Sequence, residues 1–490
     1  MKKQIKYIIA IGLVLITNIS CKKEYLTPVP PTTVSDVTAF DTPERILGNI
    51  RGLYSNTKAG AFYGGRYIVY GDIRGEDFLN ETGNLVTGAD VWSLNPAGTS
   101  TNSVVNLWAQ AYYTINLCNF TIEGVTAKGP SVVGATLTAN YLGEARLIRA
   151  LCYYSLLQYY ARPFADGAGS KPGLPLRITP IKGPGSSDLA RSTVAQIYAQ
   201  IIDDLNFAET NLPLTNATAE LNTTRAHRNT AIALKTRVYL SMQNYPGVIL
   251  EANKIVSPGN TPPFTATSGV PHALQPNIAT VFSTFNTTES IMSFPMSLSS
   301  GDNPTTQNQL AFYFVRNLTN PGSAEYSLNP VGIIGDLVGW PNADARRGLT
   351  FFNVATNKRF VNKYPNGSPF LDYPPVIRYS EVLLNLAEAL ARTNAATADP
   401  RGLALLNAVR KRSDASVTIA STTQAQLIAA IMLERRIEFL GEGLRNNDLM
   451  RLLQTIPAKG SVPAKAPTDQ GYIWPISATE MSLNKLMIDN

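Results

Sequence analysis

Residues 230–256, TAIALKTRVYLSMQNYPGVILEANKIV, hold the pattern that decides the fold of this chain. The stretch predicts one helix, a short turn at residues 243–245, and a second helix. A single helix–turn–helix unit of the kind found in helical repeats cannot bury its apolar face alone. We therefore expect it to stack on other helix pairs. The residues that set its spacing are Tyr239, Tyr245, Val248, Ala252 and Ile255.

Further helix pairs follow late in the chain, as a repeat requires. The run YSEVLLNLAEALART is followed by Asp399 as N-cap and Pro400 at the first helical position of the next helix. Another helix begins at Thr423, which forms a predicted capping box with Gln426. The spacings are close to those of tetratricopeptide units. These pairs predict a mainly α fold, a tetratricopeptide-like helical-repeat scaffold with long loop-rich insertions.

The N-terminal half adds helices of the same kind. A helix is expected from Asp41 with Pro43 in its first turn, and residues 104–123 and 141–161 predict an antiparallel helical hairpin. Thr193 and Gln196 form a second predicted capping box. The apolar stripe of the second hairpin helix consists of Ala145, Ile148, Cys152, Leu156 and Tyr159.

Two segments lack any helical or strand period. Residues 59–102 are rich in Gly, Asn, Thr and aromatic residues, and residues 257–372 are dense in turn dipeptides such as those of SPGNTPPF and NPGSAEYSLNP. Long loops on a rigid scaffold often carry function. We therefore interpret these two excursions as the parts that display a ligand site.

The N-terminus has the layout of an exported protein. Residues 1–20 combine Lys2, Lys3 and Lys6 with an apolar run that is too short to span a membrane and a small residue before Cys21. We expect a signal peptide, a lipid anchor on Cys21 and an extended tether over 21–40. An ordinary secretory leader with an incidental cysteine is the alternative.

The composition narrows the chemistry. The chain has 42 basic and 35 acidic residues, yet no basic patch with interleaved aromatics, so nucleic acid is not an expected partner. Only His227 and His272 are available as imidazole ligands, and phosphate-binding, dinucleotide and nucleophile-elbow motifs are missing from the sequence, so no metal or cofactor is predicted. Cys118 and Cys152 lie on separate predicted helices. Two buried free thiols are favoured over a disulfide bond between them, although both interpretations remain open.

The densest charged cluster, ERRIEFLGEGLRNNDLMR, contains two carboxylates on one helical face. Glu434 and Glu438 continue the stripe set by Leu427 and Ile431, so they should face neighbouring helices and need cationic partners. A structural ion-pair network is favoured over a catalytic site. The candidate partners are Arg445, Arg451, Arg378 and Arg149.

Aromatic residues in the excursions suggest binding of sugar rings, whose C–H faces stack on exposed aromatic side chains while amide and carboxylate oxygens meet hydroxyls. Most aromatic residues under long loops fill small cores instead, but Trp is rarely buried completely. The predicted ligand-binding residues are Trp92, Asn95, Asp77, Tyr326 and Trp340.

The landmarks together resemble the SusD/RagB family of outer-membrane nutrient-binding lipoproteins of Bacteroidota. The matching stretches occur in family order over nearly the whole chain. They include CKKEYL, EARLIRALCYYSLLQYYARPF, RSTVAQIYAQIIDDLNFAETNLP, RYSEVLLNLAEALAR, ERRIEFLGEGLRNNDLMR and YIWPISATEMSLN.

The resemblance implies about four tetratricopeptide-like helix pairs and no catalysis. It implies a lipid-anchored protein on the outer membrane, facing the cell exterior, which captures an oligosaccharide or other nutrient and passes it to a SusC-like TonB-dependent transporter. Cys21 matches the lipidated cysteine of the family; the ligand-binding residues rest on chemistry alone. The expected division is a signal peptide (1–20), a tether (21–40) and a body (41–490) with helical hairpins at about 41–58, 103–256 and 376–455.

Two other functions remain open from sequence. A secreted carbohydrate-active hydrolase needs only two carboxylates across a sugar, which 35 acidic residues could supply without a motif. A tetratricopeptide scaffold that binds only protein is the third, and the long aromatic loops count against it. The sequence does not identify the ligand as a particular glycan or a peptide.

Overall fold

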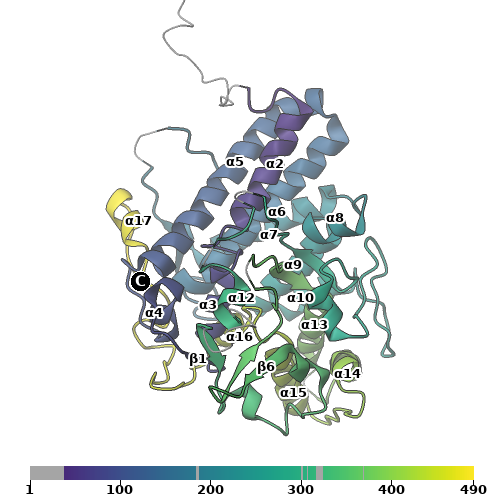
Figure 1. Ribbon diagram of the computed structural model, residues 1–490. Helices are drawn as coiled ribbons and strands as arrows, with labels where there is room; N and C mark the ends of the chain where they lie inside the picture. Colours follow the sequence, from purple (N-terminus) through teal and green to yellow (C-terminus); the bar gives the residue numbers. More distant parts are fainter. Residues whose placement is uncertain are drawn as a thin grey trace, which may run out of the picture.

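The computed structural model describes residues 38–490, except 184–186, 300–301, 306, 316–323, 368 and 395. Three long helices, α2, α5 and α6, stand side by side in the upper half of the molecule, and shorter helices and small sheets form the lower half (Figure 1). The predicted signal peptide, Cys21 and most of the tether lie outside the described residues.

Helices dominate the described chain, which confirms the mainly α prediction. In chain order they are α2 (Pro43–Thr57), α3 (Arg66–Ile73), α4 (Ala89–Trp92), α5 (Asn106–Val132), α6 (Ala135–Tyr160), α7 (Val194–Asn211), α8 (Ala219–Thr224), α9 (Arg228–Ser241), α10 (Tyr245–Ala252), α11 (Ile278–Ser283), α12 (Leu310–Phe314), α13 (Tyr379–Thr393), α14 (Pro400–Ser413), α15 (Gln424–Glu438), α16 (Arg445–Arg451) and α17 (Ala478–Leu483). Short helical turns are η2 (Leu85–Thr87), η3 (Thr101–Val105), η4 (Ile333–Gly335) and η5 (Ala345–Leu349).

The strands are short and pair only in twos among the described residues. They are β1 (Phe78–Asn80), β2 (Pro172–Pro175), β3 (Arg191–Thr193), β4 (Ser290–Ser293), β5 (Tyr326–Leu328), β6 (Thr350–Asn353), β7 (Lys358–Val361) and β8 (Pro375–Arg378). The antiparallel pairs are β1·β5, β2·β3, β4·β8 and β6·β7. Sheet therefore ties loops to the helical scaffold rather than forming a layer of its own.

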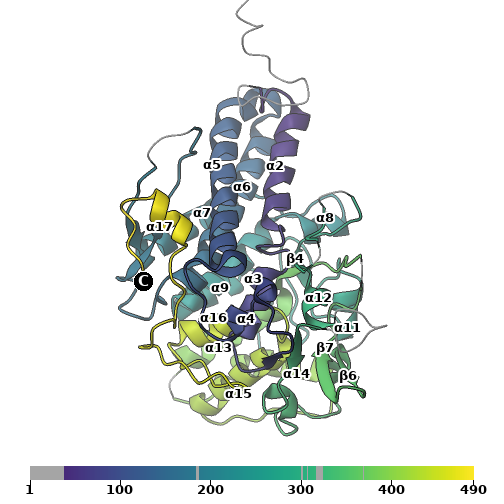
Figure 2. The same ribbon diagram turned by 60° about the vertical axis from the view of Figure 1, so that its left-hand side comes forward.

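Helix pairs form where the sequence predicts them, except at residues 41–58, which hold the single helix α2 instead of a hairpin. Helices α5 and α6 run antiparallel around Gly134, whose φ of +81° suits glycine at the reversal. Helices α9 and α10 flank the predicted turn and pack on each other, and α13 packs on both α14 and α15. Figure 2 shows the C-terminal segment with α17 along the flank of α5. The tetratricopeptide-like prediction is confirmed.

The capping predictions are confirmed in atomic detail. Thr42 caps α2 with Pro43 behind it, and Asp399 caps α14 with Pro400 at its first position. The Thr193–Gln196 box starts α7 and the Thr423–Gln426 box starts α15. Each cap satisfies backbone N–H groups that the first helical turn leaves without partners.

Replacing Thr423 by alanine is expected to lower the free energy of unfolding by about 1 kcal/mol. The Thr423 hydroxyl accepts from the N–H of Gln426 at 3.2 Å, and alanine leaves that donor without its partner. Urea denaturation measures the change. Thr423→Ser keeps the oxygen and should retain most of the stability, so equal losses for both variants would contradict the capping role.

The first excursion contains more helix than its sequence predicts. Residues 59–102 were expected to be irregular, yet α3 and the short α4 form within them. Every residue of α3 is buried, including Arg66 and Asp72. A helix that is buried on all sides has no polar face, so its sequence shows no period of 3.6 residues.

Cys118 on α5 and Cys152 on α6 are free and buried, which confirms the predicted pair of thiols. Burial raises the pKa of both thiols above the ordinary range. A thiol held in its neutral form in an apolar core is a poor nucleophile. These cysteines therefore act as small core residues.

Candidate functional site

The two excursions meet in space, although some 250 residues separate them in sequence. Strand β1 from the first pairs antiparallel with β5 from the second, and Phe78 lies opposite Leu328. Strand β7 then packs against β5 and pairs with β6. We use the name loop face for the surface formed by β1, residues 81–95, β5 and the β6–β7 hairpin; β1 and β6 lie at the lower front in Figure 1.

Asp77 fixes the loop face to the helical scaffold. Its carboxylate accepts from Nε and Nη2 of Arg436 on α15, at 2.7 and 2.5 Å, and from the backbone N–H of Ile333 at 2.7 Å. A bidentate guanidinium contact sets both the position and the orientation of a carboxylate. The side chain of Asp77 is 2% exposed, so it holds the face in place from beneath.

A second set of polar contacts joins the two excursions above Asp77. The carboxylate of Glu325 accepts from the hydroxyls of Thr82 at 2.5 Å and Thr87 at 2.7 Å. The hydroxyl of Tyr326 donates to the carbonyl of Thr87 at 2.9 Å. Glu81 forms an ion pair with Lys358 of β7. The contacts preorganise residues that belong to different loops.

Three predicted ligand-binding side chains are buried, so they present no surface to a ligand in this structure. Trp340 and Tyr326 are 1% and 0% exposed, and Asp77 is equally enclosed. The guanidinium of Arg347 covers the Trp340 ring at 4.7 Å from its centroid. The prediction of direct contact is not supported for these residues because packing and polar ties already use their rings and oxygens. They position the loop face.

Trp92 and Asn95 lie closer to the surface. Trp92 is half-buried, and its indole N–H donates to the carbonyl of Phe78 at 2.8 Å. The ammonium of Lys459 lies 5.9 Å from the Trp92 ring centroid and caps the end of α3 through the carbonyls of Arg74 and Gly75, each at 2.9 Å. Burial lowers the pKa of Lys459 well below its ordinary value. Asn95 is exposed and free to meet solvent or a ligand.

The loop face carries an exposed aromatic residue, Phe352, that the sequence pattern did not indicate. Phe352 on β6 is 44% exposed, and the guanidinium of Arg359 on β7 lies over its ring at 5.5 Å from the centroid. Two aliphatic residues of the loop face, Leu85 and Val354, are 66% and 82% exposed. The stretch TFFNVATNKRFV (350–361) carries two short β-prone runs around a polar turn, which is a hairpin signal.

The aromatic residues beneath the loop face form a core. Five aromatic residues of the two excursions are at most 5% exposed, and ring contacts link several of them, with the ring centroids of Tyr63 and Tyr67 4.6 Å apart. They therefore stiffen the excursions, as aromatic pairs do in cores. The members are Tyr63, Tyr67, Tyr70, Tyr313 and Phe314.

The carboxylates of ERRIEFLGEGLRNNDLMR form a buried ion-pair network, as predicted. Glu438 contacts Arg346 at 3.0 Å, Arg378 at 3.1 Å and Arg412 at 2.6 Å. Burial by itself raises the pKa of Glu438, but the three arginines outweigh it and hold that pKa well below its usual range. Of the predicted partners Arg378 alone joins this cluster; the others pair elsewhere, Arg445 with Glu76, Arg451 with Glu388 and Asp448, and Arg149 with Asp204.

Glu434 belongs to the same network, through Arg346 at 2.5 Å. Both Glu434 and Glu438 are 0% exposed, so neither carboxylate can reach a sugar. Within the described residues, no group of three or more His, Cys, Asp or Glu side chains is placed to hold a metal ion.

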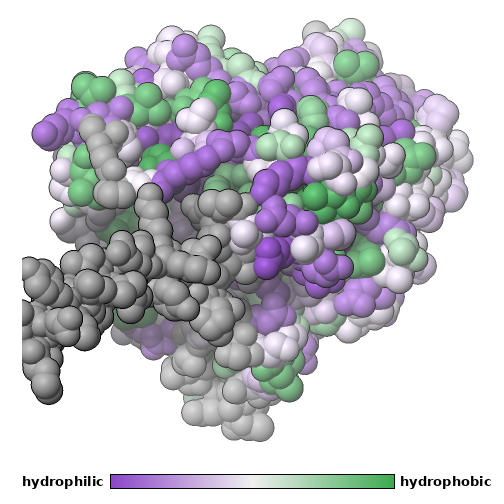
Figure 3. All heavy atoms as spheres, turned by 90° about the horizontal axis from the view of Figure 1, so that it is seen from above, coloured by the Kyte–Doolittle hydropathy of each residue, from purple (hydrophilic) through white to green (hydrophobic). Residues whose placement is uncertain are grey.

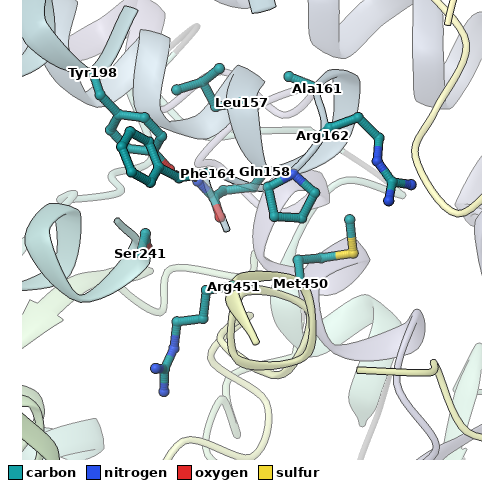
Figure 4. Close-up of a pocket in the computed structure, with 10 residues that line it drawn as sticks. Leu157, Gln158, Ala161, Arg162, Phe164, Tyr198, Ser241, Met450 and Arg451 are labelled. Carbon is teal, nitrogen blue, oxygen red and sulfur yellow. Dashed lines mark hydrogen bonds between the residues drawn. The ribbon is translucent and has the colours of Figure 1, made fainter. Parts of the chain in front are cut away.

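The molecule carries cavities of very different size. The one in Figure 4 lies between the end of α6 and α16, where the rings of Phe164 and Tyr198 stand beside Gln158. Its volume of about 10 Å³ suits one water molecule rather than a sugar. A larger groove of about 450 Å³ lies between α2 and α5, and another of about 580 Å³ follows α14.

Seen from above, polar and apolar side chains are interspersed, as on an ordinary protein surface (Figure 3).

Two family models match the chain. One, described as the SusD family, matches residues 340–490, and one described as starch-binding and associating with the outer membrane matches residues 24–240. The comparison with curated proteins finds none that matches.

Solved structures share the whole fold. A SusD superfamily protein from Bacteroides fragilis has a TM-score of 0.80 and 28% identity over 92% of this chain and 99% of its own. A laminarin-binding SusD-like protein (TM-score 0.71, 20% identity, 92% and 99% covered) and surface glycan-binding protein A from Bacteroides uniformis (TM-score 0.72, 18% identity, 92% and 99% covered) share it too. The chain belongs to the SusD family.

Proposed function

We propose that this protein captures an oligosaccharide at the cell surface and delivers it, chemically unchanged, to a TonB-dependent outer-membrane transporter. The family is one of starch-binding proteins associated with the outer membrane. Two proteins of the same fold are named for binding, one for laminarin and one for glycan. The loop face is the proposed capture surface.

One observation carries the proposal: loops from two distant parts of the chain join into a single surface on a rigid scaffold. The β1·β5 pairing brings Phe352, Trp92 and Asn95 to that surface, in company with the Glu81–Lys358 ion pair. An exposed ring supplies a stacking platform, and amide and charged groups meet hydroxyls. Sites of this kind gain affinity because the protein pays little ordering entropy on binding.

Binding without turnover is supported by the state of three carboxylates in or directly beside the loop face. A glycosidase needs one carboxyl group as acid and a second as base or nucleophile, both directed at the glycosidic bond. Asp77 is committed to Arg436, and Glu325 to two threonine hydroxyls. Glu81 is committed to Lys358. These groups act as structural anchors.

The proposed location is the outer face of the outer membrane, with the chain tethered through a lipid on Cys21. Within the described residues, no helix is both long and apolar enough to cross a membrane. Cys21 and most of the tether lie outside those residues, so the anchor rests on the sequence. Mass spectrometry of the protein extracted from membranes, before and after Cys21→Ser, tests it.

Phe352→Ala is expected to weaken oligosaccharide binding about fivefold or more, because the loss of one stacking ring costs about 1 kcal/mol. An oligosaccharide array identifies the ligand class, and calorimetry with the best oligosaccharide measures the change. The control is Tyr113→Ala, which removes a ring that is 55% exposed on α5, outside the loop face.

Product analysis of each bound oligosaccharide belongs to the same experiment. Intact oligosaccharide after long incubation supports capture, whereas cleavage would replace the proposal with a hydrolase. Equal losses from Phe352→Ala and Tyr113→Ala would remove the loop face as the binding surface. A transporter that binds the protein in the absence of any glycan binding would favour a scaffold for protein only.

A further inference from the structure

A groove of about 580 Å³ runs along the outer side of α14. Its floor is α14 itself, with Ala404, Asn407, Ala408 and Lys411 in the lining, and its walls are residues 260–264 and 273–276. None of the residues that line the groove belongs to the loop face. Its volume falls within the roughly 300–1,000 Å³ of small-molecule sites.

The walls of the groove are held in place. The backbone of Ala266 donates to His272 at 2.7 Å, and that of Ala273 donates to Thr288 at 3.2 Å. The N–H of Gln275 donates to the carboxylate of Glu289 at 2.8 Å, which also contacts Arg378 in the buried network. The groove is therefore part of the rigid body and needs no closure before a ligand enters.

Apolar side chains form most of the inner surface of the groove. Ala404 and Ala408 lie one turn apart on α14 and leave depth between the walls, while Pro262, Leu274 and Pro276 contribute saturated side chains. Removing such apolar surface from water favours binding. The groove thus fits a ligand with an apolar body.

Two of the three amide side chains in the lining, those of Asn407 and Gln275, are already occupied, and the third is that of the exposed Asn260. Asn407 donates to the carbonyls of Leu403 and Ile419 and accepts from the N–H of Ile419. The side-chain amide of Gln275 donates to the Thr288 hydroxyl at 2.6 Å. Few groups remain for the many hydroxyls of a sugar, so a neutral oligosaccharide is a poor fit.

The charge in the groove is unbalanced. Lys411 and Arg412 line it, and no described carboxylate does. Arg412 is neutralised by Glu289 and Glu438, at 2.8 and 2.6 Å. Lys411 is exposed and forms no ion pair with any described residue. One cation is therefore free at the edge of an apolar groove.

We propose that this groove binds a small amphiphilic anion, that is, an apolar chain or ring that carries one carboxylate. The apolar body lies between the walls over Ala404 and Ala408, and the carboxylate pairs with the ammonium of Lys411. The site is separate from glycan capture and does not depend on it.

Calorimetry of the purified chain with phenylbutyrate, and with phenylbutanol as its neutral partner, tests the proposal. Phenylbutyrate is expected to bind at one saturable site, and Lys411→Gln to weaken it about tenfold, the worth of one charge-assisted contact. Ala408→Leu should abolish binding because it fills the floor. Phenylbutanol should bind about as weakly to the unaltered chain as phenylbutyrate does to Lys411→Gln.

Matched controls are Lys485→Gln, an exposed lysine near the C-terminus, and Ala429→Leu, an exposed alanine on α15. Both should bind phenylbutyrate normally, as should Phe352→Ala. If Ala408→Leu proves unstable, the exposed Lys411→Gln decides alone. No saturable binding of phenylbutyrate, binding unchanged by Lys411→Gln, or equal binding of phenylbutanol would each overturn the proposal.

Discussion

Glu438→Ala is expected to lower the free energy of unfolding by about 3–5 kcal/mol, the usual cost of removing one partner from a buried ion pair. Glu438 is completely buried and contacts Arg346, Arg378 and Arg412, which come from η5, the end of β8 and α14. Without the Glu438 carboxylate, three buried guanidinium groups lose a negatively charged partner that they share. Urea denaturation at neutral pH measures the change.

The matched control is Glu123→Ala. Glu123 pairs with Lys182 at the surface, where both side chains are about half exposed, and such pairs contribute about 1 kcal/mol at most. A loss below about 1 kcal/mol for Glu438→Ala would contradict the network's structural role. Unchanged stability combined with lost turnover of a glycan would assign Glu438 to catalysis instead.

Acid is expected to destabilise the protein from about pH 6.5 downward through two buried histidines. His227 and His272 are 0% exposed and stack with their ring centroids 5.3 Å apart. Burial lowers the pKa of His227 to about 3, with the neighbouring His272 adding to the shift, and burial lowers the pKa of His272 to about 4. Both therefore stay neutral when the folded protein is mildly acidic.

The unfolded chain takes up these protons near pH 6.5, whereas the folded chain does so only near pH 3–4. Stability is then present above pH 6.5 and is lost as the pH falls toward the folded values. Between pH 6.5 and 4.5 the loss is about 2–3 kcal/mol for each histidine.

Asp372 opposes this trend, because burial raises its pKa to about 7 and so favours the folded state as the carboxyl is protonated. Comparison with His227→Gln/His272→Gln isolates the histidines from Asp372 and from other carboxylates. Between pH 6.5 and 4.5 the unfolding free energy of the double variant should fall less steeply with decreasing pH. The difference in slope should correspond to about two protons bound on unfolding. Identical slopes would mean that the imidazoles are protonated in the folded protein.

The scaffold could be predicted from sequence because each helix carries its own local signal. The capping residues Thr193, Asp399 and Thr423 mark where helices begin, and apolar stripes mark the faces that pack. Helix α3 has no such signal, since it is buried on every side. Its helical state depends on neighbours that are distant in sequence.

The loop face could be predicted only in part. The composition of the two excursions led to the proposal that they display the site, but the pairing of Phe78 with Leu328 has no local signature. Which aromatic side chains are exposed could not be predicted from the sequence. Trp340 and Tyr326 are core residues, whereas Phe352 is exposed. The sequence does not distinguish a buried aromatic residue from an exposed one, and only the packed structure separates the two cases.

Hydrogen–deuterium exchange with the oligosaccharide selected from the array tests the central claim most directly. The account predicts that binding protects residues 78–95 and 350–361 together, with the oligosaccharide recovered intact. Two segments that far apart in sequence share protection only if one ligand touches the surface that β1 and β5 join. Protection confined to other segments, or a cleaved oligosaccharide, would contradict capture at the loop face.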